Sequence, residues 1–141
     1  MLRSDATMSR FLLICFGGAL GTGARYLMSG WVLRSLGAGL PLGTLSVNVI
    51  GSFLLAVIMH VGLTTGLLSP DARLVLGTGV LGGFTTYSTF NYETMQYMQE
   101  GAFALATLNI AVTVMACLAA GGLGIALGRC TWSASCPSST T

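Results

Sequence analysis

The chain has 141 residues, of which 53% are hydrophobic and only 7% are charged. Soluble proteins have about 25% charged residues, far more than this chain, and its mean hydropathy is +0.80. We therefore predict a membrane protein. The formal net charge of +2 is too small to favour a nucleic-acid partner.

Four apolar stretches are long enough to cross a bilayer, which takes about 20 mostly apolar residues. They are residues 11–33, 42–68, 74–92 and 101–128. We therefore predict an all-α transmembrane domain with four helices over residues 11–129, after an N-terminal tail of residues 1–10. Residues 130–141 are rich in Ser and Thr and are predicted to form a disordered C-terminal tail.

The first stretch combines small residues with one charge. Gly17 and Gly21 have the spacing that lets helices approach closely in lipid, and helix packing is the favoured interpretation. Arg25 lies within the stretch, where a guanidinium is costly unless it reaches the interface or faces a partner or a wet cavity. Two interpretations stay open for Arg25: a role in attracting an anion to a pore vestibule, and an interfacial anchor beside Tyr26 and Trp31.

The second stretch carries a polar face. Thr44, Asn48 and Ser52 are spaced by four and therefore line one side of a helix. Hydrogen bonding to another helix contributes only about 0.6 to 2 kcal/mol per contact in membranes; we favour that role for Ser52 more than for Asn48. His60 is expected at the interface, with no metal assigned to it.

The start of the third span has a clear signal. Ser69 is predicted to be the N-cap, Pro70 the first helical residue and Asp71 an acid at the positive end of the helix dipole. The span is predicted to begin near Pro70 and to continue through Met98, before Gly101.

The segment Gly79 to Glu93, GVLGGFTTYSTFNYE, is poor material for a lipid-facing helix, because glycines and hydroxyl residues crowd it. We predict that the third helix is broken near Gly82 to Thr86, since two glycines before a hydroxyl run can let a helix open. Freed backbone groups at membrane depth are tolerated only where protein or water surrounds them. The segment is therefore predicted to be a site.

The fourth stretch has a weaker polar face, with Asn109, Thr113 and Cys117 at successive i+4 positions. Gly124 and Gly128 repeat the spacing for close packing. The four cysteines form no CxxC pair and no zinc-like spacing. Those within spans are interpreted as small apolar residues, and a disulfide in the tail stays open.

No catalytic constellation emerges, so we predict that the chain is not an enzyme. The inward polar groups are hydrogen-bond donors, with Arg25 as a cation: Thr44, Ser46, Asn48, Thr85, Thr86, Tyr87, Ser88, Thr89 and Thr113. Such donors suit a small anion, whose hydration shell they must replace. Tyr87 and Phe90 share a helical face, and the positive edge of an aromatic ring can face an anion, although core packing is the alternative for Phe90.

Two other function classes stay open. A proton-coupled exporter of the small-multidrug type would transport cations and would need a carboxylate inside an early span. The first two spans hold none, and Glu93 is the candidate acid. A membrane assembly factor without transport activity is the third class.

Three motifs resemble those of the Fluc (CrcB) fluoride channels. They are GTGARY at Gly21 to Tyr26, GTLSVNVIGSF at Gly43 to Phe53, and GTGVLGGFTTYSTFNYET at Gly77 to Thr94. The resemblance covers essentially Phe11 to Arg129. It implies an antiparallel, dual-topology homodimer in the cell inner membrane, with two fluoride pores and a central structural sodium ion (Na⁺), which exports fluoride passively.

The resemblance also implies roles for individual residues. The main-chain carbonyls of Gly82 and Thr85 from both subunits would bind Na⁺. Tyr87 and Phe90 would be the pore aromatics, and Asn48 would be the pore amide. The vestibule and hydroxyl track would comprise Arg25, Thr44, Ser88, Thr89 and Thr113.

The chain departs from the family pattern at three points. Tyr87 stands where phenylalanine is usual, and Asn109 and Cys117 stand where the polar track has tyrosine or serine. The arginines are also unevenly divided: a four-span topology places Arg3, Arg10, Arg73 and Arg129 on one side and Arg34 on the other. The positive-inside rule would then favour both termini in the cytoplasm.

Overall fold

The computed structural model describes residues 2–37 and 39–135, and within these ranges the chain is all helical. The elements are α1 (Leu2–Leu36), α2 (Leu42–Thr64), α3 (Pro70–Leu74), the π-helix η1 (Val75–Leu81), α4 (Gly82–Phe84), α5 (Tyr87–Gln99) and α6 (Phe103–Ser135). Among the described helices, three segments are long and apolar enough to cross a membrane: Thr7–Leu36, Leu42–Thr64 and Phe103–Cys130. The predicted all-α class is confirmed.

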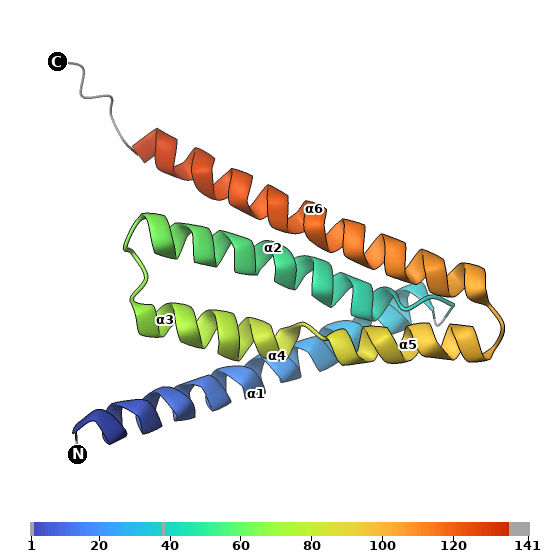
Figure 1. Cartoon of the computed structure of the whole chain (residues 1–141), viewed down its shortest axis with the longest axis horizontal. Coiled ribbons are helices and arrows are strands. Elements are labelled where there is room, and N and C mark those ends of the chain that lie inside the picture. Colours follow the sequence, from blue (N-terminus) through green and yellow to red (C-terminus); the bar gives the residue numbers. More distant parts are fainter. Residues whose placement is uncertain (1, 38, 136–141) are drawn as a thin grey trace.

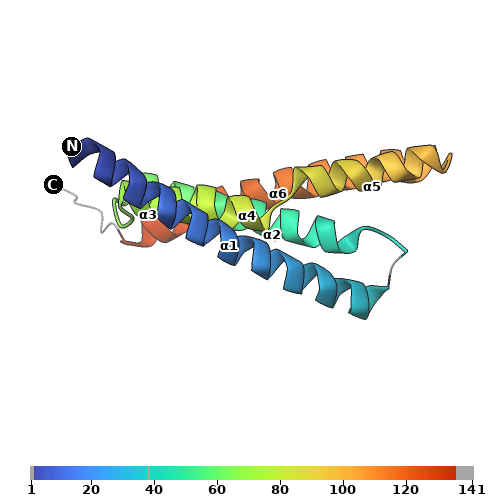
Figure 2. The same ribbon diagram turned by 90° about the horizontal axis from the view of Figure 1, so that it is seen from below.

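The helices form an elongated bundle. In Figure 1, α6 and α2 run side by side, and the interrupted segment from α3 to α5 lies along them. Helix α1 crosses this segment and packs against η1 and α4. Figure 2 shows that the C-terminal half of α1 then diverges from α5. A cavity lies between α1, α2 and α5 in this region, as described below.

Glycines set the distance between α1 and the interrupted segment. A Cβ atom on Gly21 would collide with the backbone carbonyl of Val80, and one on Gly17 would lie 3.2 Å from the carbonyl oxygen of Val75. The packing role predicted for Gly17 and Gly21 is therefore confirmed.

Glycines play the same role between α2 and α6. A Cβ on Gly124 would lie 2.6 Å from the carbonyl oxygen of Phe53, and one on Gly128 would lie 2.6 Å from Cδ2 of His60. The second predicted pair is thus also confirmed, and His60 packs against α6.

The helix opens at Thr85 (φ −81°, ψ 158°) and Thr86 (φ −150°, ψ 116°). The predicted break is confirmed, and the opening lies in the hydroxyl residues, since Gly82 and Gly83 stay helical in α4. Two β-branched residues, which suit extended backbone, form the opening. Thr86 also caps α5, since its side-chain oxygen accepts a hydrogen bond from the N–H of Thr89 at 3.3 Å.

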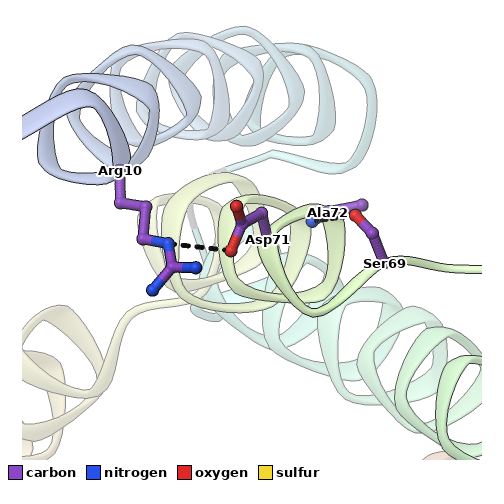
Figure 3. A network of polar contacts seen from close by, with 4 residues as sticks. All are labelled: Arg10, Ser69, Asp71 and Ala72. Atoms are coloured by element: carbon purple, nitrogen blue, oxygen red, sulfur yellow. Dashed lines mark hydrogen bonds and ion pairs between the residues drawn. The ribbon is translucent and has the colours of Figure 1, made fainter. Parts of the chain in front are cut away.

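The predicted start of the third segment is confirmed (Figure 3). Ser69 Oγ accepts a hydrogen bond from the N–H of Ala72 at 3.1 Å, and Pro70 is the first residue of α3. Asp71 Oδ1 pairs with Arg10 Nε at 2.9 Å, which joins α3 to α1. Both charged side chains are about half exposed, so the pair contributes on the order of 0.2–1 kcal/mol.

The ends of the chain differ from the predicted boundaries. Helix α1 begins at Leu2, and no glycine or proline interrupts the residues before Gly17. It ends at Leu36, because Gly37 adopts a φ of +82°. Helix α6 continues to Ser135, and the rest of the predicted tail, with Cys136, lies outside the described residues. The cysteines that the structure describes, Cys15, Cys117 and Cys130, are free thiols.

We predict that Gly83→Ala destabilises the protein. Its Cβ would lie 2.5 Å from the carbonyl oxygen of Gly18, and backbone cannot move aside as a flexible side chain can. Overpacking of this kind costs about 1–3 kcal/mol, so the thermal melting temperature in detergent should fall. Gly23→Ala is the matched control, because a Cβ there meets nothing within 4 Å. Equal melting temperatures for the two variants would contradict this packing.

Candidate functional site

The break is held by one side chain from α2. Asn48 Nδ2 donates a hydrogen bond to the carbonyl oxygen of Thr86 at 3.0 Å, and the Thr86 N–H donates to Asn48 Oδ1 at 2.8 Å. In a continuous α-helix this N–H would bond to the carbonyl of Gly82. Asn48 therefore replaces the backbone partner that Thr86 loses. Asn48 and Thr86 are both buried, with 9% and 8% exposure.

Hydroxyl groups gather around the same residue. Thr86 Oγ1 lies 3.0 Å from Thr89 Oγ1 and 3.4 Å from Ser88 Oγ. Ser88 is exposed and Thr89 is half-buried. The predicted hydroxyl residues of α5 thus form one cluster at its N-terminus.

A first cavity, the vestibule cavity, has a volume of about 380 Å³ and lies between α1, α2 and α5. Its polar lining residues are Thr22, Arg25, Ser29, Thr44, Thr86, Thr89 and Glu93. Arg25 is half-buried and forms no ion pair with the part of the chain that the structure describes. Its cationic charge is therefore available to an anion that enters the cavity.

Glu93 brings a carboxylate into the vestibule cavity. Thr44 Oγ1 donates a hydrogen bond to Glu93 Oε1 at 2.6 Å. The other carboxylate oxygen, Oε2, is buried and has no hydrogen-bond partner among the described residues. Because a hydroxyl has a single proton, Thr44 cannot donate to an anion while this bond stands. Glu93 lies in the middle of α5.

A second cavity, the aromatic cavity, has a volume of about 320 Å³ and lies between α2, the break, α5 and α6. Its polar and aromatic lining residues are Asn48, Ser52, Thr85, Thr86, Tyr87, Phe90, Thr113 and Cys117. The rings of Tyr87 and Phe90 have centroids 5.8 Å apart and planes inclined at 56°. The shared helical face predicted for these two rings is confirmed. Phe90 is buried, whereas Tyr87 is 77% exposed on the subunit.

Thr86 lines both cavities, so the break borders each of them. The predicted site residues divide between them. Arg25, Thr44 and Thr89 line the vestibule cavity. The aromatic cavity takes Asn48, Tyr87, Phe90 and Thr113. Ser88 lines neither cavity, and Gly82 lies exposed just before the break.

Several polar residues were not among the predicted site residues. Thr86 could have been found from its position, since a threonine before a helical segment is a preferred N-cap. No local pattern indicated that Thr94 is buried or that it accepts a hydrogen bond from Asn109 at 2.9 Å. Both are properties of the contact between α5 and α6.

The described residues contain no cluster of three or more His, Cys, Asp or Glu side chains that could hold a metal ion. Main-chain oxygens are the other possible ligands, and hard cations bind oxygen. Since the Thr86 N–H bonds to Asn48, the carbonyl of Gly82 lacks its usual helical donor. Gly82 is exposed on the subunit, so its carbonyl oxygen is a candidate ligand for a hard cation.

The chain has clear relatives. The family described as CrcB-like protein, Camphor Resistance (CrcB), matches residues 12–125. The fluoride-specific ion channel FluC of Anaeromyxobacter dehalogenans is 57% identical over 113 residues, which cover 80% of this chain and 90% of that protein. The proteins of the same name from Sorangium cellulosum and Geobacter metallireducens are 52% and 46% identical over 122 residues. Those 122 residues cover 86% of this chain and 96% and 98% of the relatives.

We predict that Asn48→Leu loosens the break. The substitution leaves the N–H and the carbonyl of Thr86 without partners, which costs about 1–3 kcal/mol per buried group. Hydrogen–deuterium exchange at the Thr86 amide should therefore accelerate, and the melting temperature should fall. Ser52→Ala, one turn away on the same face of α2, should leave this exchange rate unchanged. Unchanged exchange in Asn48→Leu would show that Asn48 does not hold the break.

Proposed function

Since the chain belongs to the CrcB family, we propose that it is a fluoride channel of the cell inner membrane, which lets fluoride leave the cell passively. The named relatives are fluoride-specific ion channels and align over at least 90% of their own length. The chain is thus proposed to be a multi-pass ion channel and not an enzyme.

The observation that carries this proposal is a pair of cavities that share the break residue Thr86 and have hydrogen-bond donors in their linings. Asn48 uses one N–H on Thr86, and its second N–H has no partner in the described chain. Thr113 forms no hydrogen bond with the described residues and lines the same aromatic cavity. An anion that leaves water needs such unoccupied donors along a narrow path.

The proposed path begins at Arg25, whose charge attracts fluoride into the vestibule cavity. It continues past Thr89 to the break and then past Asn48. Thr44 lies beside this path and can donate to the ion only when its bond to Glu93 opens. Beyond the break, the edges of the Phe90 and Tyr87 rings and the Thr113 hydroxyl replace water around the ion. Ser88, which is exposed on one subunit, would join the hydroxyl track in the dimer.

We place four spans in each subunit, with α3 to α5 as the broken third span. Two subunits in antiparallel, dual-topology orientation would form a homodimer with two pores. The exposed Tyr87 ring and the exposed Gly82 support this arrangement, because a polar break beside them needs protein or water around it rather than lipid.

The main-chain carbonyls of Gly82 and Thr85 from both subunits would hold a structural Na⁺ at the dimer centre. The diverted Thr86 N–H supports the fit, since it leaves the Gly82 carbonyl oxygen available. When bound, the ion supplies positive charge that stabilises these carbonyl dipoles in a medium without water. It takes no part in moving fluoride.

One observation favours a second candidate, the proton-coupled cation exporter of the small-multidrug type. Glu93 holds a carboxylate oxygen buried and unpartnered among the described residues, and an acid at membrane depth is often a proton or cation site. Arg25 in the same cavity opposes a cationic substrate. The fluoride channel is therefore the better-supported function.

Liposomes that contain the protein and potassium fluoride should release fluoride when valinomycin lets K⁺ follow. The channel gives fluoride a path, and valinomycin removes the opposing voltage. A fluoride electrode measures the release against protein-free liposomes. Release no faster than from those liposomes would contradict the proposed function, and pH-driven uptake of a cationic dye would support the exporter instead.

Two substitutions separate the aromatic rings within this assay. Phe90→Ile removes a ring edge from the path and should slow release by up to about tenfold, since a ring contact is worth about 0.5–1.5 kcal/mol. Tyr87→Phe keeps the ring and should release fluoride at the wild-type rate. Equal losses in both variants would assign the Tyr87 contribution to its hydroxyl.

In dual topology, half of the subunits place a given loop on one side of the membrane, and the other half place it on the opposite side. A cysteine introduced at Gly39, in the loop before α2, should react with a membrane-impermeant maleimide from both sides. A background that lacks the native cysteines provides the control. Labelling from one side alone would show a single orientation, which the distribution of Arg10, Arg73 and Arg129 against Arg34 favours.

A further inference from the structure

A chain of three polar groups joins α6 to α5 one helical turn beyond Phe90. Asn109 Nδ2 donates a hydrogen bond to Thr94 Oγ1 at 2.9 Å, and the Thr94 hydroxyl donates to the carbonyl oxygen of Phe90 at 2.8 Å. Thr94 is only 2% exposed, so solvent does not compete for its oxygen. The single hydroxyl therefore accepts from one helix and donates within the other.

These groups lie next to the proposed fluoride path. Thr94 follows Phe90 by four residues on α5, and Thr113 follows Asn109 by four residues on α6, so each pair shares a helical face. The contact between Asn109 and Thr94 is thus one turn from the place where Phe90 and Thr113 line the aromatic cavity. Rotation of α5 about its axis would move the Phe90 ring relative to Thr113.

Helix α5 needs such contacts because the break separates it from α4. No continuous ladder of backbone hydrogen bonds passes through Thr85 and Thr86 to fix its rotation. Asn48 holds its N-terminus, and Thr44 bonds to Glu93 on the side of α2. Asn109 is the partner from α6.

Asn109 itself lies away from the aromatic cavity. It borders a separate, mostly apolar hollow with Leu45, Tyr97, Leu105 and Leu108. Its amide donates to Thr94, so it acts on α5 and not directly on an ion.

We propose that Asn109 and Thr94 are positioning residues that fix the rotation of α5 and thereby hold the Phe90 ring at the aromatic cavity. The proposal rests on the proposed fluoride-channel function. Asn109, which departs from the family pattern, then has a role in the packing of α5 and α6 rather than in the ion path.

The test compares Thr94→Val and Asn109→Leu with Thr94→Ser in the liposome assay. The first two remove the hydrogen bond between the helices and should slow fluoride release by about tenfold, as small misplacements of a functional group do. Thr94→Ser keeps the hydroxyl and should stay within about twofold of wild type. Both removals should also lower the preference for fluoride over chloride, which a loss of stability alone would not change.

Thr107→Val is the matched control. The Thr107 hydroxyl donates to the carbonyl oxygen of Phe103 at 2.9 Å, the same bond within a helix as in Thr94. Thr107 is exposed, however, and among the described residues it has no hydrogen-bond partner on another helix. Release and selectivity should equal those of wild type. If Thr94→Val and Asn109→Leu behave as this control does, the positioning role is overturned.

The double variant Thr94→Val/Asn109→Leu decides the case in which a single variant does not fold, because it leaves neither partner buried without the other. Its loss of melting temperature should be smaller than the sum of the single losses, while its fluoride release stays slow. Wild-type release from the double variant would overturn the proposal. If the wild-type protein itself releases no fluoride, the proposed channel function is wrong. The melting temperatures then test the hydrogen bond between Thr94 and Asn109 separately. Losses of melting temperature that add up in the double variant would show that the two residues do not interact.

Discussion

The structure depends on one constraint: the backbone amide of Thr86 leaves its helix at membrane depth and must still be hydrogen-bonded. Thr85 and Thr86 open the chain, and the N–H and carbonyl of Thr86 must find partners without water. Asn48 supplies both, because a side-chain amide donates and accepts at once. One turn along α2, Gly51 makes room for the side chain of Thr85, with which a Cβ at that position would collide. Helix α2 thus provides both the hydrogen-bond partners and the space that the break needs.

Glycines and threonines have different roles in the interrupted segment, α3 to α5. Gly83 stays helical and lets α1 approach the backbone, since even a methyl group there would meet the carbonyl of Gly18. The threonines leave the helix, and Thr86 restarts it as the N-cap of α5. Close packing therefore holds α4 in place, while side-chain hydrogen bonds hold α5. The two halves of the segment are fixed by different interactions.

Local patterns predicted the features that depend on neighbours in sequence. The cap at Ser69, the break near Thr86 and the packing spacing of Gly124 and Gly128 could all be predicted, because each needs only a few adjacent residues. Which residue of the segment opens could not be predicted in the same way, because the close contact of Gly83 with α1 depends on tertiary packing. The positions of Glu93 and Thr94 depend on which helices face α5, and no local pattern contains that information.

The hydrogen bonds divide the polar groups of the site into two kinds. Groups with partners fix the structure: Thr86 is held by Asn48, Thr94 by Asn109, and the Thr44 hydroxyl bonds to Glu93. Groups without partners in the described chain lie at the cavities, where Arg25 and Thr113 are the main examples. Asn48 belongs to both kinds, because one N–H holds the break while the other remains available. A hydrogen-bonded frame with a few unoccupied donors suits an ion that must lose its water. The same amide that makes the break tolerable in the membrane thus also provides a donor in the aromatic cavity, beside the residue that both cavities share.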